Sequence, residues 1–272
     1  MAADLALCLA VEERQHAGWV DGYLARLGVD RPLAADEDAL RRLQLRHLLT
    51  VPFENLSVHR REPVVLAAQP LVDKIVGARR GGFCYELNGA FAALLTELGY
   101  RVSLLQARVS TPSGLGPPFD HLALRVDLDQ PWLVDVGFGR FAHRPLRFDE
   151  RGDQVDPGGV FRIAEADHGD LDVSLDGEPE YRLDVRPREL ADFEAASWWH
   201  RTSPRSHFTQ ELICSILTDD GRITLSNRQL IRTTAEGREE QALVTDDEVL
   251  DAYHRWFGIT LDEVPTVREP VA

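Results

Sequence analysis

The chain has 272 residues, of which 44% are hydrophobic and 28% charged, a composition typical of a globular protein with a substantial core. Its formal net charge is −15 and no block of Lys and Arg stands out. This argues against a nucleic-acid partner and against binding to an anionic membrane. A polyanionic ligand would need a local basic site or a group of backbone N–H donors.

The N-terminal residues hold a short apolar stretch that no basic segment precedes, and Glu12 and Glu13 interrupt it. This pattern predicts neither a signal peptide nor a membrane span. Cys8, Cys84 and Cys214 are odd in number and widely spaced, which disfavours a disulfide framework and favours a reducing compartment. No pair of Cys or His has the spacing of metal ligands. We therefore expect a cytoplasmic protein without a metal site.

The first part of the chain is predicted to be helical. Residues 36–49 begin with acidic side chains, which suit the positive end of a helix. They place Leu40 and Leu43 on one face, and Pro52 then ends the segment. A second helix is predicted over residues 84–98.

Short β-prone segments follow at residues 102–109, 121–127 and 132–136. Two Asp-Gly pairs predict hairpin turns, one at Asp176–Gly177 and one at Asp220–Gly221.

The tail of the chain is mixed. An aromatic-rich connection around Trp198 and Trp199 leads to a last helix from about Asp246, where Thr245 and Glu248 form a capping box. The order of helices, then strands, then a mixed tail predicts segregated α and β regions rather than alternating βαβ units.

The segment with the clearest chemistry is Gly81-Gly82-Phe83-Cys84, at the predicted start of the second helix. Glycines allow a sharp turn into the helix, and a thiol at a helix N-terminus faces the positive end of the dipole, which favours the nucleophilic thiolate. A small buried cysteine that only packs is the alternative. Cys214, like Cys8, lacks such a turn and is expected to be inert.

A cysteine nucleophile needs a base and a group that orients this base. The chain between His121 and Asp135 predicts a β-hairpin, and a register centred near Leu128 would place these two residues opposite each other. A slip of one residue would put them on opposite faces, where they would be ordinary surface residues. His200 and His207 lie in the aromatic-rich connection and are expected at most to line a cleft.

Four motifs, in this order, resemble those of the arylamine N-acetyltransferase family, which includes the related macrolactam amide synthases. P-F-E-N-L is matched by residues 52–56, and the nucleophile motif R-G-G-[YF]-C-[FY]-E-x-N by residues 80–88. A histidine strand begins at His121, and residues 134–139 match V-D-V-G-F-G. Each motif is short, but their joint occurrence in order is specific, and the resemblance covers most of the chain.

The resemblance implies an α+β fold in three parts. A helical N-terminal domain over residues 1–98 would carry the nucleophile, and a β-barrel-like middle domain over residues 99–190 would carry the histidine and the aspartate. An α/β C-terminal lid would span residues 191–272.

The implied catalytic triad, in a papain-like arrangement, is Cys84, His121 and Asp135. The implied reaction is a ping-pong transfer of an acetyl group from acetyl-CoA, the acyl donor, to an arylamine, arylhydrazine or hydroxylamine through an acyl-cysteine. The backbone N–H of Cys84 would stabilise the oxyanion. Glu54 and Arg80 are expected to pair and brace the nucleophile loop; a solvated role for both charges is the alternative.

Four apolar residues match positions near the acceptor pocket of the family, namely Phe53, Val109, Phe138 and Phe208. Aromatic walls suit an arylamine ring, but a place in the ordinary core is an equal alternative for each residue.

After Gly139 the chain departs from the pattern of many family members and reads Arg140-Phe141-Ala142-His143-Arg144-Pro145. This departure leaves the acceptor and coenzyme selectivity open. Three other functions stay open: an amide synthase that closes a macrolactam from a carrier-bound polyketide, a cysteine hydrolase or transglutaminase-like enzyme, and a non-catalytic binding module. The sequence predicts neither the natural amine nor the oligomeric state.

Overall fold

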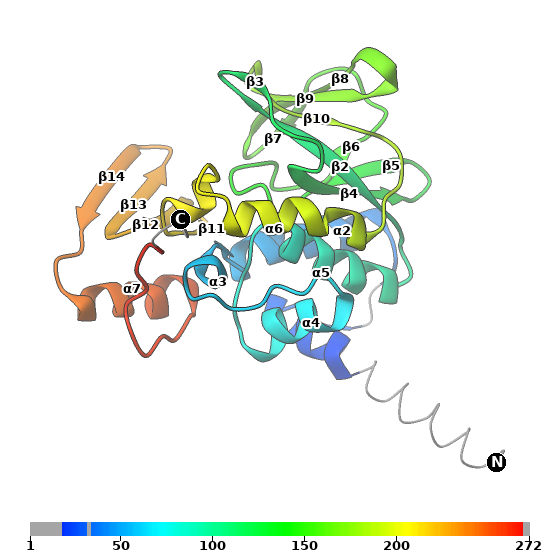
Figure 1. Ribbon diagram of the computed structural model, residues 1–272. Coiled ribbons are helices and arrows are strands. Elements are labelled where there is room, and N and C mark those ends of the chain that lie inside the picture. Colours follow the sequence, from blue (N-terminus) through cyan, green and yellow to red (C-terminus); the bar gives the residue numbers. More distant parts are fainter. Residues whose placement is uncertain (1–17, 32–33, 269–272) are drawn as a thin grey trace, which may run out of the picture.

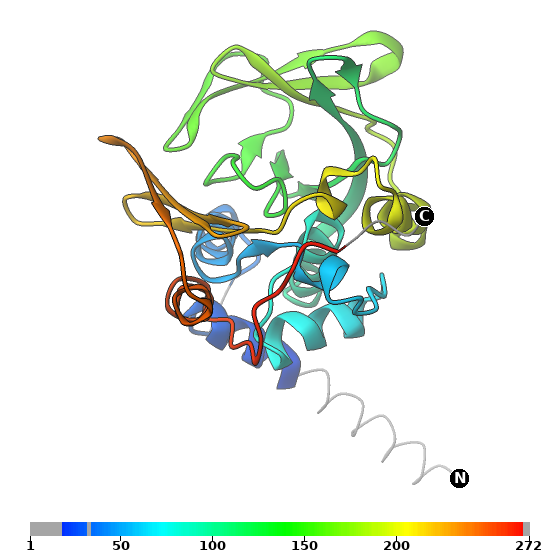
Figure 2. The same ribbon diagram turned by 60° about the vertical axis from the view of Figure 1, so that its left-hand side comes forward.

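The computed structural model describes residues 18–31 and 34–268, so Cys8 lies outside the described part of the chain. A layer of helices supports a large curved sheet, and a smaller sheet with a C-terminal helix lies beside both (Figure 1). Figure 2, turned by 60°, shows the smaller sheet and the large sheet on the same side of the helical layer. Within the described residues, no helix is long and apolar enough to cross a membrane.

The helical layer comes from the first hundred residues, as predicted. Residues 18–27 are helical, and the elements that follow are α2 (Glu37–Thr50), α3 (Leu56–His59), α4 (Ala68–Val72), a π-helical turn (Asp73–Gly77) and α5 (Cys84–Glu97). Helix α2 begins after Asp36, whose side chain accepts a hydrogen bond from the backbone N–H of Ala39. Helix α5 begins at Cys84, and Gly99 follows its end with a φ of +93°.

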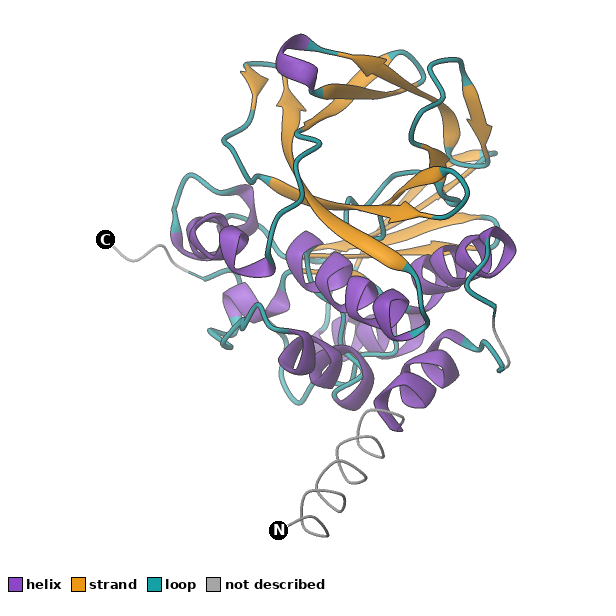
Figure 3. Ribbon diagram, turned by 90° about the vertical axis from the view of Figure 1, so that its right-hand side faces the viewer, coloured by secondary structure: helices purple, strands orange, loops and turns teal. Residues whose placement is uncertain are grey.

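The large sheet has the strand order β6-β5-β4-β2-β10-β9-β8-β7, and β3 pairs with β2 at one end. Its strands are β2 (Arg101–Thr111), β3 (Gly114–Leu115), β4 (His121–Asp127), β5 (Pro131–Val134), β6 (Leu146–Arg147), β7 (Gln154–Asp156), β8 (Gly159–Glu165), β9 (Leu171–Leu175) and β10 (Glu178–Leu183). Figure 3 shows that these strands curl into a nearly closed ring. The predicted barrel-like sheet is therefore confirmed.

Strand β4 separates two hydrophobic cores because its side chains alternate between its faces. Leu122 and Leu124 pack with helices α2 and α5, whereas Ala123 packs with residues inside the barrel, such as Phe161 and Tyr181. The barrel interior and the helical layer thus share one strand, and His121 lies at the start of it.

The smaller sheet joins distant parts of the chain in the order β1-β11-β12-β13-β14. Its elements are β1 (Phe53–Glu54), β11 (Ile213–Thr218), β12 (Gly221–Ser226), β13 (Gln229–Thr234) and β14 (Gly237–Ala242), and α7 (Asp246–Phe257) follows them. Phe53 pairs with Ser215, so the P-F-E-N-L motif forms the edge of this sheet. The predicted capping box of Thr245 and Glu248 is confirmed at the start of α7.

Two predictions about the tail were wrong. The aromatic-rich passage is not a connection, because Trp198 and Trp199 lie in helix α6 (Glu194–Thr202), which lies in front of the helical layer in Figure 1 and at its side in Figure 2. The second hairpin turns at Asp219–Asp220 because Thr218 pairs directly with Gly221, one residue earlier than predicted.

Gly81 is needed where the nucleophile loop passes the end of α2. A Cβ atom at this position would lie 1.9 Å from the backbone oxygen of Pro52, a distance that forces the backbone to move. We therefore expect Gly81→Ala to lower the free energy of unfolding by about 1–3 kcal/mol, as strain of this kind does elsewhere. The measurement is thermal and urea unfolding beside Gly77→Ala, a control position whose Cβ would meet nothing within 4 Å. Equal stabilities of the two variants would contradict this account.

Candidate active site

A cavity of about 540 Å³ lies where the helical layer, the barrel and the smaller sheet meet. Cys84 and His121 both line it. The four apolar residues predicted for an acceptor pocket line it as well, namely Phe53, Val109, Phe138 and Phe208. Phe53 lies 6.0 Å from Phe208 between ring centroids, so aromatic rings form part of the wall.

His121, in the wall of this cavity, is in direct contact with the buried Asp135. The Nε2 atom of His121 lies 2.7 Å from Oδ2 of Asp135, and neither residue is more than 2% exposed. The carboxylate also accepts hydrogen bonds from Asn88 Nδ2 and from the backbone N–H of Gly137, both at 2.9 Å. Tyr181 donates a longer hydrogen bond of 3.4 Å to Oδ2.

The predicted register of this hairpin was wrong, although the predicted face was right. Leu124 pairs with Val134, so the register centres on Asp129 rather than near Leu128. Asp135 follows the last paired residue and does not lie directly opposite His121. Because the shift amounts to two residues, both side chains keep the same face of the sheet, and they meet diagonally.

Cys84 is the first residue of α5 and lines the cavity beside His121. Its thiol is close enough to His121 to contribute to the raised pKa of the imidazole. The turn after β5 packs closely against the nucleophile, since a Cβ atom on Gly137 would lie 2.8 Å from Cα of Cys84. The structure thus brings together the three residues that the sequence predicted as a triad.

The charge of Asp135 changes the protonation of His121. Burial alone would lower the pKa of the imidazole, but the charge and hydrogen bond of Asp135, with the contact to Cys84, raise this pKa to about 10. His121 is therefore an imidazolium at neutral pH. An imidazolium beside a thiol favours the thiolate, the form in which cysteine acts as a nucleophile.

Ion pairs that involve buried carboxylates fix the loop that carries the nucleophile. Arg80 donates from Nε to Oε1 of Glu54 at 3.0 Å, and Glu54 is completely buried, so the expected pair is present in the structure. Lys74, the only lysine in the chain, donates to Glu86 at 2.6 Å. The carboxylate of Glu86 accepts from the backbone N–H of Phe83, one residue before the nucleophile.

The two histidines of the aromatic-rich segment also line the cavity. His200 lies on α6 with its Nε2 atom 3.1 Å from Oδ1 of Asp120, the residue before His121. His207 lies in a 3-10 turn over His207–Thr209, and burial lowers its pKa. Cys214 is fully buried on β11, and burial raises the pKa of its thiol well above the ordinary value, which fits an inert packing thiol.

Sequence reasoning gave no role to Asn88, Lys74 or Glu86. The spacing of Asn88 was a usable signal, because residues four apart share one face of a helix and Asn88 follows Cys84 by four. The contact between Lys74 and Glu86 joins two separate segments of the chain, so no local sequence pattern predicts it.

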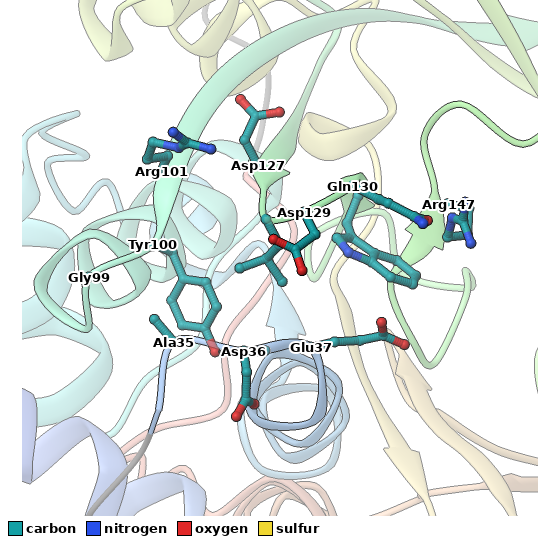
Figure 4. A pocket seen from close by; sticks show the side chains of 12 residues that line it. Ala35, Asp36, Glu37, Gly99, Tyr100, Arg101, Asp127, Asp129, Gln130 and Arg147 are labelled. Carbon is teal, nitrogen blue, oxygen red and sulfur yellow. Dashed lines mark hydrogen bonds between the residues drawn. The ribbon is translucent and has the colours of Figure 1, made fainter.

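Figure 4 shows another cavity, of about 670 Å³, at the start of α2 and the turn between β4 and β5. Its charged lining residues are Asp36, Glu37, Arg101, Asp127, Asp129 and Arg147. None of the predicted site residues lines it, and its lining among the described residues includes no cysteine, serine or histidine. Among residues 18–31 and 34–268, no group of three or more His, Cys, Asp or Glu side chains is placed to hold a metal ion.

Removing Glu54 should destabilise the protein, because Arg80 and Lys74 would then lose a buried counter-charge. We expect Glu54→Ala to cost about 3–5 kcal/mol in the free energy of unfolding. The control Glu37→Ala removes an exposed pair with Arg41 and should cost less than about 1 kcal/mol. Urea unfolding of both variants measures the difference.

The loss of stability in Glu54→Ala should also depend on pH. Burial would raise the pKa of this carboxyl, but Lys74 and Arg80 outweigh it and lower the pKa below its ordinary value. The Glu54 carboxylate therefore contributes fully to the free energy of unfolding above the unfolded-state pKa of about 4.3. This contribution is lost as the pH falls from there through the lower folded-state pKa. A stability difference between wild type and Glu54→Ala that does not shrink on acidification would contradict this account.

The comparisons with known proteins agree on one family. The N-acetyltransferase family matches residues 36–266. The arylamine N-acetyltransferase of Escherichia coli K12 is 35% identical over 89% of this chain and 89% of its own. The arylamine N-acetyltransferase of Mycolicibacterium smegmatis is 35% identical over 89% of this chain and 92% of its own. A solved structure of the Mycobacterium marinum arylamine N-acetyltransferase in complex with CoA is 33% identical, covers 88% of this chain and 92% of its own, and superposes with a TM-score of 0.81. The chain therefore belongs to the arylamine N-acetyltransferase family, whose members are acyltransferases.

Proposed function

We propose that the protein transfers an acetyl group from acetyl-CoA to an arylamine by a ping-pong mechanism through an acetyl-Cys84 intermediate. The observation that carries this proposal is the buried contact between His121 and Asp135 beside Cys84, in the wall of an aromatic-lined cavity. The names of the relatives, and the CoA complex of the M. marinum enzyme, support the choice of donor and acceptor.

In the first half-reaction the thiolate of Cys84 attacks the thioester carbonyl carbon. The carbonyl oxygen becomes an oxyanion, and because Cys84 is the first residue of α5, its backbone N–H has no acceptor within the helix and is free to stabilise that charge. The carbon–sulfur bond to coenzyme A then breaks. The leaving thiolate takes the proton of the His121 imidazolium, so His121 is neutral when the acetyl-enzyme forms.

In the second half-reaction the amine nitrogen attacks the acetyl carbon, and the bond to Cys84 breaks. Neutral His121 takes the excess proton of the amine, and Cys84 leaves as a thiolate. This restores the starting ion pair. Asp135 keeps the imidazole in place throughout, since its carboxylate is fixed by Asn88 and Gly137.

The aromatic side chains of the cavity support an aryl acceptor. Phe53, Phe138 and Phe208 line the same space as the nucleophile, and His121 contacts Phe138 edge-on at 5.0 Å between ring centroids. An aromatic ring of the acceptor would pack against such walls in offset or edge-to-face geometry.

The division into a helical part (1–98), a barrel part (99–190) and a C-terminal lid (191–272) is also proposed. Separate hydrophobic cores in the barrel and in the C-terminal part support it. Strand β1 departs from it, because Phe53–Glu54 belongs to the first part in sequence and to the C-terminal sheet in space.

The direct experiment is intact mass spectrometry of the protein after incubation with acetyl-CoA and no amine. We expect wild type to gain one acetyl group and to lose it when an arylamine is added, while Cys84→Ala gains none. Asp135→Asn should acetylate more slowly by about 10⁴-fold, as loss of the orienting carboxylate does in other triads.

A folded wild-type protein that gains no acetyl group and releases no coenzyme A would contradict an acetyl-CoA donor. Acylation by a carrier-bound chain instead would then favour the amide synthase. Rapid loss of the acetyl group to water, with no effect of amine, would favour a hydrolase.

A further inference from the structure

The segment that leads into His121 contains a strained residue. Phe119 has a φ of +63°, in the left-handed region that a side chain with a Cβ atom disfavours. Strand β4 begins at His121, two residues later. A non-glycine residue persists in this region only where its surroundings hold it, and such residues cluster at active sites. The contacts of Phe119 therefore show what fixes the chain just before His121.

Buried side chains satisfy both backbone polar groups of Phe119. Its N–H donates to Oε1 of Gln106, on β2, at 2.8 Å. Its carbonyl accepts from the hydroxyl of Tyr85, on α5, at 2.6 Å. The next carbonyl, that of Asp120, accepts from the same hydroxyl at 3.2 Å. The ring of Phe119 packs edge-on against Phe193, with 5.2 Å between the ring centroids. The left-handed conformation is thus held by hydrogen bonds as well as by packing.

Tyr85 directly follows the nucleophile, so its hydroxyl joins the N-terminal turn of α5 to the chain before His121. Asn88, three residues further along α5, donates to the carbonyl of Leu122 at 2.6 Å. Residues three apart lie on one face of a helix. The carbonyls before and after His121 therefore both accept hydrogen bonds from side chains of the helix that begins with Cys84.

The hydroxyl of Tyr85 is a proton donor and not a phenolate. Burial, followed by the charges of Cys84 and Asp120, raises its pKa well above the ordinary value. The ring has its own packing partner in Phe83, edge-on at 5.3 Å between centroids, so the loss of the hydroxyl alone would leave that packing in place. The nucleophile motif of the family admits phenylalanine at this position, which makes the hydroxyl a feature of this chain rather than of the motif.

We propose that the hydroxyl of Tyr85 is a positioning group for the catalytic triad. It holds the chain before His121 against the start of α5 and thereby fixes the imidazole beside the thiol of Cys84. Asp135 orients the ring of His121, whereas Tyr85 fixes the backbone that carries this ring. The inference rests on the proposed function and adds a residue that acts through His121 rather than on the substrate.

The test compares Tyr85→Phe with Tyr100→Phe in the full chain. Tyr100 is a matched control because its hydroxyl also donates to a backbone carbonyl, that of Asp36 at 2.9 Å, and because it does not line the cavity of the nucleophile. Both variants should lower the urea midpoint of unfolding by a similar amount, since each loses one hydrogen bond of this kind.

The readout that separates the two variants is the pH profile of Cys84 alkylation by iodoacetamide, followed by peptide mass spectrometry. The thiolate is the reactive form, and a displaced imidazolium stabilises it less. Tyr85→Phe should therefore raise the pH of half-maximal alkylation by about 0.5–1 unit, which corresponds to the loss of one hydrogen bond. Tyr100→Phe should leave the profile unchanged. In the acetylation assay, only Tyr85→Phe should be slower, by about 3- to 10-fold.

A second variant, Gln106→Ala, removes the acceptor on the other side of Phe119 and should shift the profile in the same direction. Because both side chains hold one residue, the shift in the double variant with Tyr85→Phe should be smaller than the sum of the two single shifts.

An alkylation profile of Tyr85→Phe that matches wild type would overturn the proposal. Equal shifts in Tyr85→Phe and Tyr100→Phe would do so as well, because the hydroxyl would then act on stability alone. Alkylation needs neither acetyl-CoA nor an amine, so these outcomes do not depend on the proposed donor and acceptor.

Discussion

The carboxylate of Asp135 is fully buried, and residues from several elements donate hydrogen bonds to it. A buried charge without hydrogen-bond donors is too costly to keep, so the donors around it are fixed in place. They come from β4 through His121, from the turn after β5 through Gly137, and from α5 through Asn88. Because Asn88 lies one helical turn after Cys84, the contact also sets the position of the nucleophile along and around the helix. The hydrogen bonds to this one carboxylate therefore fix β4, the turn after β5 and α5 relative to one another, and with them His121 and Cys84.

Two cations, Lys74 and Arg80, help to fix the nucleophile loop through ion pairs with buried carboxylates. Lys74 and Arg80 form ion pairs with Glu86 and Glu54, and these carboxylates hold the backbone just before Cys84 and at the start of α3. Glu86 accepts from the N–H of Phe83, and Glu54 accepts from that of Leu56 at the start of α3. The loop between α4 and α5 is thus fixed through charges rather than through packing alone.

Local signals in the sequence predicted the elements that carry the site. The acidic start of α2, the glycine turn before α5 and the capping box of α7 each depend on residues within a few positions of one another, so they can be found without the fold. The shared face of His121 and Asp135 could be predicted because side chains alternate along a strand, and the two-residue error in register did not change this alternation. The barrel could be expected only through the family resemblance, because the sheet depends on distant pairs such as Ala107 of β2 with Leu183 of β10. No local pattern encodes a contact between segments that far apart.

The most direct test of this account is the protonation state of His121. With ¹³C-labelled histidine and a His121→Gln variant to assign the resonance, NMR follows the imidazole from neutral to alkaline pH. The account predicts an imidazolium at pH 7 that titrates near pH 10 in wild type, and a pKa several units lower in Asp135→Asn. A neutral His121 at pH 7 in wild type, or a pKa unchanged by the loss of the Asp135 charge, would contradict it.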